Sequence, residues 1–171
     1  MKSQQHFSLD LKIIDDFLDD DYHNQILTLL DGCVFPWYYQ KTLTHGCNDI
    51  QAHGFNHWLS SESDPEFCTL VEMMQSYLNA KECLRVRADM TLYNPQGYRH
   101  SFHVDSQEPH TVCIYYVNNS DGDTIILGDN GNLERVAPKA NRLIVFNGRY
   151  LHTGHSPSRH KNRILINANF R

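Results

Sequence analysis

The stretch HTVCIYYVNNSDGDTIIL, residues 110–127, contains two short runs of β-branched and aromatic residues on either side of the polar segment NNSDGD. Runs of this composition, bounded by Asn, Asp and Gly, are typical of strands joined by turns. Similar runs lie before and after it: LRVRADMTLY (84–93), NRLIVF (141–146) and RILINANF (163–170). Because no helical pattern separates these runs, we expect an antiparallel β-sandwich or jelly roll.

The first half of the chain carries two helical patterns. In DDDYHNQILTLLDG (19–32), isoleucine and leucine supply an apolar stripe, and Asp20 or Asp21 can cap the free N–H groups of the first turn. In DPEFCTLVEMMQSYLNA (64–80), apolar residues recur at helical spacing, and Asp64 is the expected cap. We therefore expect helices packed outside a mainly β core.

The length and the cysteines favour one domain with reduced thiols. A chain of 171 residues can bury a core without disulfides. We expect a single domain over residues 1–171, in which residues 1–83 give helical support and outer strands and residues 84–171 form the jelly-roll core. The cysteines are odd in number and scattered, which argues against a disulfide framework. They are Cys33, Cys47, Cys68, Cys83 and Cys113.

The charge pattern argues against two classes of partner. The chain has 15 Lys and Arg against 20 Asp and Glu, a formal net charge of -5, and no basic run. A nucleic-acid partner is not expected, because phosphate binding needs clustered basic side chains. No apolar run approaches the length of a membrane span, so we predict a soluble, cytoplasmic protein without a membrane partner.

The segment GYRHSFHVDSQEPH, residues 97–110, gathers three histidines and two acids. In an extended chain, residues i and i+2 point to the same side, so His103 and Asp105 can reach one point in space and bind a metal. A lone His-x-Asp pair is weak evidence in a chain with 11 histidines. We assign no role to His100, His110 and His160.

The segment NGRYLHTGHSPSRHKNRILINANFR, residues 147–171, adds a histidine after a strand and turn, and an arginine at the start of the last β run. Two histidines and one carboxylate on one face of a metal define the facial triad of non-haem Fe(II) oxygenases. The planar fork of Arg163 pairs bidentately with carboxylates. The two segments together therefore indicate an iron site with a neighbouring carboxylate site.

These residues resemble the Fe(II)- and 2-oxoglutarate-dependent dioxygenases, in particular the prolyl-4-hydroxylase-like branch. The resemblance covers roughly residues 84–171 and implies a double-stranded β-helix (cupin-like) core. The matching pattern is a tyrosine, a glycine turn, His-x-Asp, a distal histidine and an arginine. In this chain it is met by Tyr93, Gly97, His103, Asp105, His152 and Arg163.

The resemblance implies that Fe(II) is held by His103, Asp105 and a distal histidine, for which LHTGHSP offers two candidates. The family commonly places the arginine about ten positions after this histidine, and Arg163 follows His152 by 11 positions and His155 by 8. The context FNGRYLH, a strand and a turn leading into the histidine, favours His152. His155 is then a residue of the rim.

The resemblance also implies tyrosines for the cosubstrate. The far carboxylate of 2-oxoglutarate is expected to meet Arg163 and Tyr116, and Tyr93 resembles a second cosubstrate-side tyrosine. In the strand TVCIYYV, Tyr116 shares a face with Ile114 and Val112, whereas Tyr115 shares the other face with Cys113. The alternative is that these tyrosines are aromatic core residues with satisfied hydroxyls.

On the last strand, Arg163, Asn167 and Asn169 alternate with apolar residues and share one face. If Arg163 points into the barrel, both asparagines do so too, unless Asn169 lies past the pocket and faces water. Asn167 and Tyr98 are the candidate substrate-binding residues. The aromatic segment 34–61 is expected either to line a substrate groove or to form a hairpin packed on the barrel.

The implied activity is hydroxylation of a C–H bond, most simply in a prolyl or other peptidyl residue, with succinate and CO2 as co-products. The cofactors are then Fe(II), 2-oxoglutarate and O2, with ascorbate as a candidate reductant. Asp105 favours hydroxylation over halogenation, and Asn169 stands where the DNA-repair demethylases carry a second arginine. The alternatives are a hydroxylase of free amino acids or other small molecules, and a non-catalytic cupin-like metal-binding or sensor protein. The sequence leaves the oligomeric state open.

Overall fold

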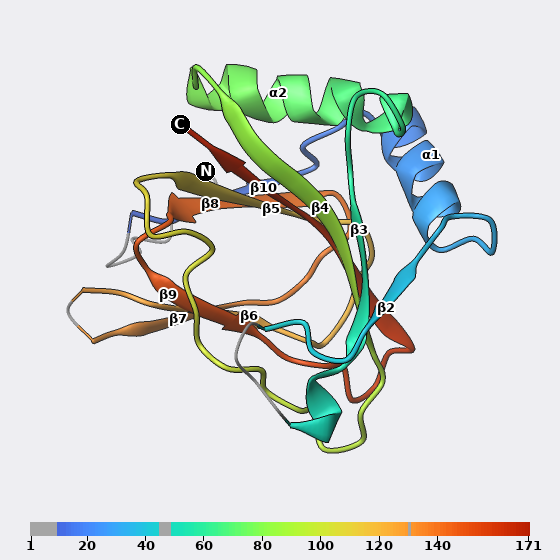
Figure 1. Cartoon of the computed structure of the whole chain (residues 1–171), viewed down its shortest axis with the longest axis vertical. Helices are drawn as coiled ribbons and strands as arrows, with labels where there is room; N and C mark the ends of the chain where they lie inside the picture. The colour runs from blue at the N-terminus through green and yellow to red at the C-terminus, as the bar shows by residue number, and fades with distance from the viewer. Residues whose placement is uncertain (1–9, 45–48, 130) are drawn as a thin grey trace, which may run out of the picture.

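The computed structural model describes residues 10–44, 49–129 and 131–171. Within these residues the chain forms two α-helices and ten strands (Figure 1). The helices are α1 (Asp20–Leu30) and α2 (Cys68–Leu78). The strands are β1 (Lys12–Asp15), β2 (Tyr38–Gln40), β3 (Gly54–Trp58), β4 (Cys83–Leu92), β5 (Thr111–Tyr116), β6 (Thr124–Leu127), β7 (Leu133–Val136), β8 (Arg142–Asn147), β9 (Leu151–Gly154) and β10 (Asn162–Phe170).

The strands form two sheets. The larger sheet has the order β1-β8-β5-β10-β4-β3-β2, and the smaller has the order β7-β6-β9. All pairings between the described strands are antiparallel. From β5 onward the chain alternates between the sheets, since β5, β8 and β10 lie in one and β6, β7 and β9 in the other. The prediction of a mainly β protein with a jelly-roll core is confirmed.

Two apolar clusters occupy the two faces of the larger sheet. Ile114 and Tyr116 of β5 pack with residues of β6 and β7 in a cluster between the sheets. Cys113 and Tyr115 of the same strand pack on the outer face, with Leu30 of α1 and other helix residues. Figure 1 shows α2 lying along this outer face. The predicted alternation along β5 is therefore confirmed.

The cap of α1 differs by one residue from the expected one. Asp19 is the N-cap, and its side chain accepts a hydrogen bond from the Tyr22 backbone N–H at 2.9 Å. Asp20 and Asp21 lie in the first turn of the helix. A side chain within the first turn does not reach the free N–H groups as the preceding residue does, so the prediction of Asp20 or Asp21 as the cap was wrong.

Asp64 does not cap a helix with its side chain. A 3₁₀ turn, Pro65–Phe67, follows it, and α2 begins only at Cys68. The Asp64 carboxylate instead accepts a hydrogen bond from the Ser60 backbone N–H at 3.1 Å and lies 3.0 Å from His57 Nε2. These contacts occupy the carboxylate and tie the loop after β3 to that strand, so the expected cap was wrong.

The aromatic segment 34–61 forms β2 and β3, which pair at the edge of the larger sheet. The Trp37 indole N–H donates to the Leu30 carbonyl at 3.1 Å, whereas Trp58 is 57% exposed. The hairpin expectation is therefore met for the described part of this segment. The described cysteines are free thiols, and Cys47 lies outside the described residues. Among the described helices, none is long and apolar enough to span a membrane.

Candidate functional site

A cavity lies between the two sheets and is lined by side chains from both. It encloses about 530 Å³ of space free of protein atoms, part of which is open to solvent. In the described residues, nine buried side-chain nitrogen and oxygen atoms have no hydrogen-bond partner, and seven of them belong to residues that line this cavity. Buried polar atoms are normally satisfied, so their concentration here indicates a binding site. These residues are Arg87, Asp89, Thr91, His100, His152, Arg163 and Asn167.

His103 and His152 face each other across a short antiparallel bridge. The His103 N–H donates to the His152 carbonyl at 3.0 Å, and the His152 N–H donates back at 2.9 Å. Asp105 Oδ1 lies 3.7 Å from His103 Nε2 and 3.8 Å from His152 Nε2. One ligand atom from each residue lies within 4.8 Å of the others, so the three side chains can hold one metal ion.

The hydrogen bonds of the two imidazoles fit a metal. His103 Nδ1 lies 3.1 Å from the Ser101 carbonyl and His152 Nδ1 lies 3.2 Å from the Tyr150 carbonyl, so each Nδ1 carries the proton and donates it. The Nε2 lone pairs then face Asp105, and His152 Nε2 is buried without a partner. Burial lowers the pKa of His152 to about 4, which keeps its ring neutral at pH 7. Neutral imidazoles oriented by backbone carbonyls are the usual form of histidine ligands.

His155, the other candidate for the distal position, lies outside this cluster. Its backbone forms a bridge with Arg99, and its N–H donates to the Asp123 carbonyl at 3.0 Å. It stands three residues beyond His152, past the end of β9. Of the two histidines, the structure therefore brings His152 to His103 and Asp105.

One cation and two amide donors from the larger sheet hold the Asp105 carboxylate. Arg85 Nη2 lies 2.7 Å from Oδ1, and the amides of Asn167 and Asn169 donate to Oδ2 at 3.1 and 3.0 Å. Burial alone would raise the pKa of Asp105, but His152, Arg85 and the two amides outweigh it and hold the pKa well below its usual range. Asn169 therefore lies beside Asp105 and does not face water. Arg85 was missed by the sequence analysis.

Arg163 is a buried cation without a counter-ion. Its Nη2 donates to Thr124 Oγ1 at 2.7 Å, and the Tyr116 hydroxyl donates to the same oxygen at 2.6 Å. Arg163 Nε has no hydrogen-bond partner, and its guanidinium makes no ion pair with any described residue. Burying an unpaired charge is unfavourable, so the site is complete only with an anion.

Gly154 makes room for this guanidinium. A Cβ atom at Gly154 would lie 2.9 Å from Arg163 Nη1, closer than a side chain can approach. The glycine between the two candidate histidines therefore lets Arg163 cross β9 and reach the cavity. Gly154 is visible in the sequence, but its role in leaving space for Arg163 can be recognised only once the packing of β9 against Arg163 is known.

The structure does not bring the other two predicted tyrosines to the cavity wall. Tyr93 is 55% exposed and lies just past the end of β4. Arg87, Asp89 and Thr91 of β4 line the cavity, whereas the Tyr93 side chain does not, although its backbone N–H still donates to the Lys161 carbonyl at 2.9 Å. The Tyr98 ring packs edge-on against His100 with 5.0 Å between centroids.

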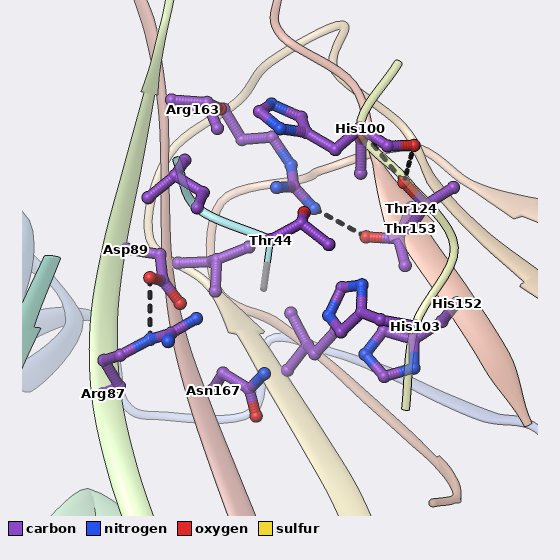
Figure 2. Close-up of a pocket in the computed structure, with 15 residues that line it drawn as sticks. Thr44, Arg87, Asp89, His100, His103, Thr124, His152, Thr153, Arg163 and Asn167 are labelled. Carbon is purple, nitrogen blue, oxygen red and sulfur yellow. Dashed lines mark hydrogen bonds and ion pairs between the residues drawn. The ribbon is translucent and has the colours of Figure 1, made fainter. Parts of the chain in front are cut away.

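His100, to which we assigned no role, lines the cavity. Thr153 Oγ1 donates to the His100 carbonyl at 2.7 Å and fixes the backbone, while the ring is buried. Figure 2 shows it beside Arg163 and the two threonines, Thr124 and Thr153. Burial is the first cause that lowers the pKa of His100 to about 4, and the Arg163 charge adds to it.

We expect the stability of the metal-free protein to fall as the pH is lowered from 6.5 to about 4. His100 and His152 have pKa values of about 4 when folded and 6.5 when unfolded, so in this window the unfolded chain binds protons that the folded chain does not. Together they should lower the free energy of unfolding by on the order of 5 kcal/mol. Urea unfolding at pH 7.0 and 4.5 measures this, and His100→Asn should reduce the difference. Equal stability at both pH values would contradict the assigned cause.

The loop before β10, which leads into Arg163, is held by one carboxylate. Asp121 accepts hydrogen bonds from the backbone N–H groups of Ser158, Arg159 and His160, each at 3.2 Å, and from the Ser158 hydroxyl at 2.8 Å. We expect Asp121→Ala to lower the free energy of unfolding by about 1–3 kcal/mol, because several donors lose a charged acceptor. Urea denaturation checks this. Asp129→Ala, which removes an exposed carboxylate paired with Arg149, should change stability much less.

The fold is that of the Fe(II)- and 2-oxoglutarate-dependent oxygenases. The structure superposes on a Pseudomonas putida prolyl-4-hydroxylase with a TM-score of 0.69, at 15% identity and covering 96% of this chain and 94% of that one. It superposes on a prolyl hydroxylase from Trichoplax adhaerens, solved with a hypoxia inducible factor peptide fragment, with a TM-score of 0.73 at 16% identity, covering 95% and 84%.

The same fold occurs in a protein of a different activity. The α-ketoglutarate-dependent epimerase SnoN from nogalamycin biosynthesis superposes with a TM-score of 0.72, at 10% identity and covering 94% of this chain and 77% of that one. No protein-family model matches the sequence, and no curated protein matches it. The comparisons thus confirm the fold that the resemblance implied.

Proposed function

We propose that this protein is an Fe(II)- and 2-oxoglutarate-dependent dioxygenase that hydroxylates a C–H bond of a prolyl or other peptidyl residue, with succinate and CO2 as co-products. The observation that carries the proposal is the unpaired, buried Arg163 in the same cavity as His103, Asp105 and His152. A protein that only bound a metal would have no need for this cation. The prolyl hydroxylases among the structural neighbours support the peptidyl substrate.

The residues of the cavity have separate roles in this proposal. His103, Asp105 and His152 hold Fe(II), with Arg85, Asn167 and Asn169 orienting the carboxylate. Bound iron, together with 2-oxoglutarate and O2, supplies the oxidising chemistry that hydroxylates the substrate. Arg163 pairs with the far carboxylate of 2-oxoglutarate.

Tyr116 and Thr124 keep Arg163 in place. The Thr124 hydroxyl accepts from both Arg163 and Tyr116, so its own hydrogen is free to point at the same anion. The sheet walls shield part of the cavity from solvent. Ascorbate is a candidate reductant, as expected from the sequence, and residues 1–171 form one catalytic domain.

A second candidate substrate is a free amino acid or another small molecule. An ion pair in the cavity wall, Arg87 with Asp89, favours it, because a small zwitterion can pair with both charges at once. The action of SnoN in nogalamycin biosynthesis shows that this fold also accommodates small molecules in other proteins.

The experiment that tests the proposal is anaerobic titration of the Fe(II)-loaded protein with 2-oxoglutarate. We expect a weak visible metal-to-ligand charge-transfer band that saturates with 2-oxoglutarate and is missing when Zn(II) replaces Fe(II). Iron that is bound without such a band at any 2-oxoglutarate concentration would overturn the oxygenase proposal and leave a metal-binding protein.

A further inference from the structure

One wall of the cavity carries charges that neither the metal site nor the Arg163 site uses. Arg87, Asp89 and Thr91 are alternate residues of β4, so all three point to the same face of the sheet and into the cavity. Figure 2 shows Arg87 and Asp89 on the opposite side of the cavity from His103 and His152. This wall is therefore within reach of a molecule placed beside the metal.

Arg87 and Asp89 form an ion pair that leaves binding capacity on both sides. Arg87 Nε lies 2.8 Å from Asp89 Oδ1, but neither atom has a hydrogen bond of acceptable geometry. No described residue accepts a hydrogen bond from the Arg87 Nη atoms. The side chains are 17% and 11% exposed, so the pair is largely removed from water. Buried ions that lack some of their hydrogen bonds favour binding of a ligand that supplies those hydrogen bonds.

The guanidinium of Arg87 is held in place on its other side. It lies over the Trp58 ring, 5.5 Å from the centroid, and Trp58 pairs with Arg87 in the register of β3 and β4. This cation–π contact and the Asp89 carboxylate restrict the fork before any ligand arrives. A preorganised fork binds a carboxylate with less loss of conformational entropy.

Arg87 is distinct from the anion site at Arg163. On β10, the partners of Arg87 and Thr91 are Asn167 and Arg163, four residues apart, which is about 13 Å along a strand. Asn167 donates to Asp105 Oδ2 at 3.1 Å, so Arg87 stands at the metal end of the cavity and Arg163 at the far end. A diacid that joins Arg163 to the metal therefore leaves Arg87 free.

We propose that Arg87 binds the α-carboxylate of the hydroxylation substrate, and that Asp89 accepts the neighbouring α-nitrogen hydrogen. This inference rests on the proposed function and narrows its substrate to an amino acid with a free α-carboxylate. A carboxylate and an N–H on one carbon match a guanidinium and a carboxylate that lie side by side. Leu43, Ile114 and Leu165 line the same cavity and give the substrate side chain apolar contacts. The amino acid is either free or the last residue of a peptide.

Calorimetric titration of the anaerobic Fe(II)- and 2-oxoglutarate-loaded protein tests this proposal. The probes are the free L-amino acids, their α-carboxamides, and Gly-Gly-X peptides with free or amidated C-termini. We expect at least one free acid to bind, and its carboxamide to bind about 10- to 100-fold more weakly, since one charged partner is lost. The Arg87→Gln protein should bind the free acid more weakly by a similar factor. It should bind the acid and its carboxamide with equal affinity. Binding of the amino acid or of the peptide distinguishes the two sources.

Three controls separate the outcomes. Arg149→Gln changes an exposed arginine that does not line the cavity and should leave every affinity unchanged. Arg87→Lys keeps the charge and should retain part of the preference for the acid over the amide. The third control is the comparison of acid and amide in the unmodified protein, which does not depend on the folding of any variant. The charge-transfer band, recorded on the same samples, reports the proposed function independently.

Two results would overturn the inference while leaving the oxygenase proposal intact. The first is a normal charge-transfer band in a protein that binds none of the probes or binds acids and amides equally. The second is an Arg87→Gln protein whose affinity for 2-oxoglutarate falls as strongly as that of an Arg163 variant, since Arg87 would then belong to the cosubstrate site. Absence of the band in the unmodified protein is instead a failure of the proposed function.

Discussion

Asp105→Ala is expected to reduce Fe(II) affinity by more than about 100-fold, because loss of a direct ligand exceeds the effect of losing one of its hydrogen-bonding partners. Asp105 is the single carboxylate in the described cluster that can hold a metal, and its Oδ1 lies within 4 Å of both histidine Nε2 atoms. Competition with a fluorescent chelator measures the affinity. The 2-oxoglutarate-dependent band should disappear with the iron.

The same substitution should also destabilise the metal-free protein. Arg85 lies 2.7 Å from Asp105, and the Asn167 and Asn169 amides donate to the same carboxylate, so removing it leaves a half-buried cation and two amides without their acceptor. Asp129→Ala is the matched control, since it removes an exposed carboxylate with one arginine partner. Unchanged Fe(II) affinity in Asp105→Ala would remove the basis for the metal site.

Strand alternation could be predicted from the sequence because it depends only on neighbouring residues. The face shared by Ile114 and Tyr116, and the face shared by Arg163, Asn167 and Asn169, both follow from the period of two along an extended chain. The structure has both faces as predicted, with Tyr116 beside Thr124 and both asparagines beside Asp105. His103 and Asp105 of the metal cluster were found for the same reason, since they are two positions apart, whereas His152 followed from the resemblance.

The pairing of distant strands could not be predicted in this way. Arg85 meets Asp105 because β4 pairs with β10 in a register that sets Arg85 opposite Asn169. Trp58 reaches Arg87 because β3 pairs with β4 in a register that sets those two residues opposite each other. Register depends on long-range packing and turn geometry, so the second wall of the cavity was invisible in the sequence.

Strand ends were the other feature that the sequence did not resolve. Tyr93 continues the alternation of Arg87, Asp89 and Thr91, but β4 ends at Leu92 and the tyrosine is exposed. His100, three residues into the cluster that suggested a metal, turned out to line the cavity because a backbone hydrogen bond to Gly154 draws its segment against β9. Element boundaries are set by competing local contacts, which a pattern of residue types does not resolve.

Arg163→Met is expected to weaken 2-oxoglutarate binding by more than about 100-fold, because two charge-assisted hydrogen bonds in a buried site are lost. Fe(II) affinity should stay the same, since Arg163 does not contact the metal cluster. Titration of the charge-transfer band measures the first quantity, and chelator competition measures the second. Arg142→Met is the matched control, since Arg142 already pairs with Asp15, with Nε 2.6 Å from Oδ1. It should leave 2-oxoglutarate affinity unchanged and lower stability.

Stability distinguishes a binding role of Arg163 from a structural one. In the metal-free protein Arg163 is a buried cation whose neighbours Thr124 and Tyr116 carry no charge, so an apolar side chain of similar length should leave the free energy of unfolding unchanged or raise it. A residue kept only for the fold would show the opposite, a loss of stability with no change in 2-oxoglutarate affinity. A buried cation that lowers the stability of the ligand-free protein but binds an anion is the pattern expected of a binding site. An Arg163→Met protein that is less stable but binds 2-oxoglutarate normally would therefore remove the argument on which the oxygenase proposal depends.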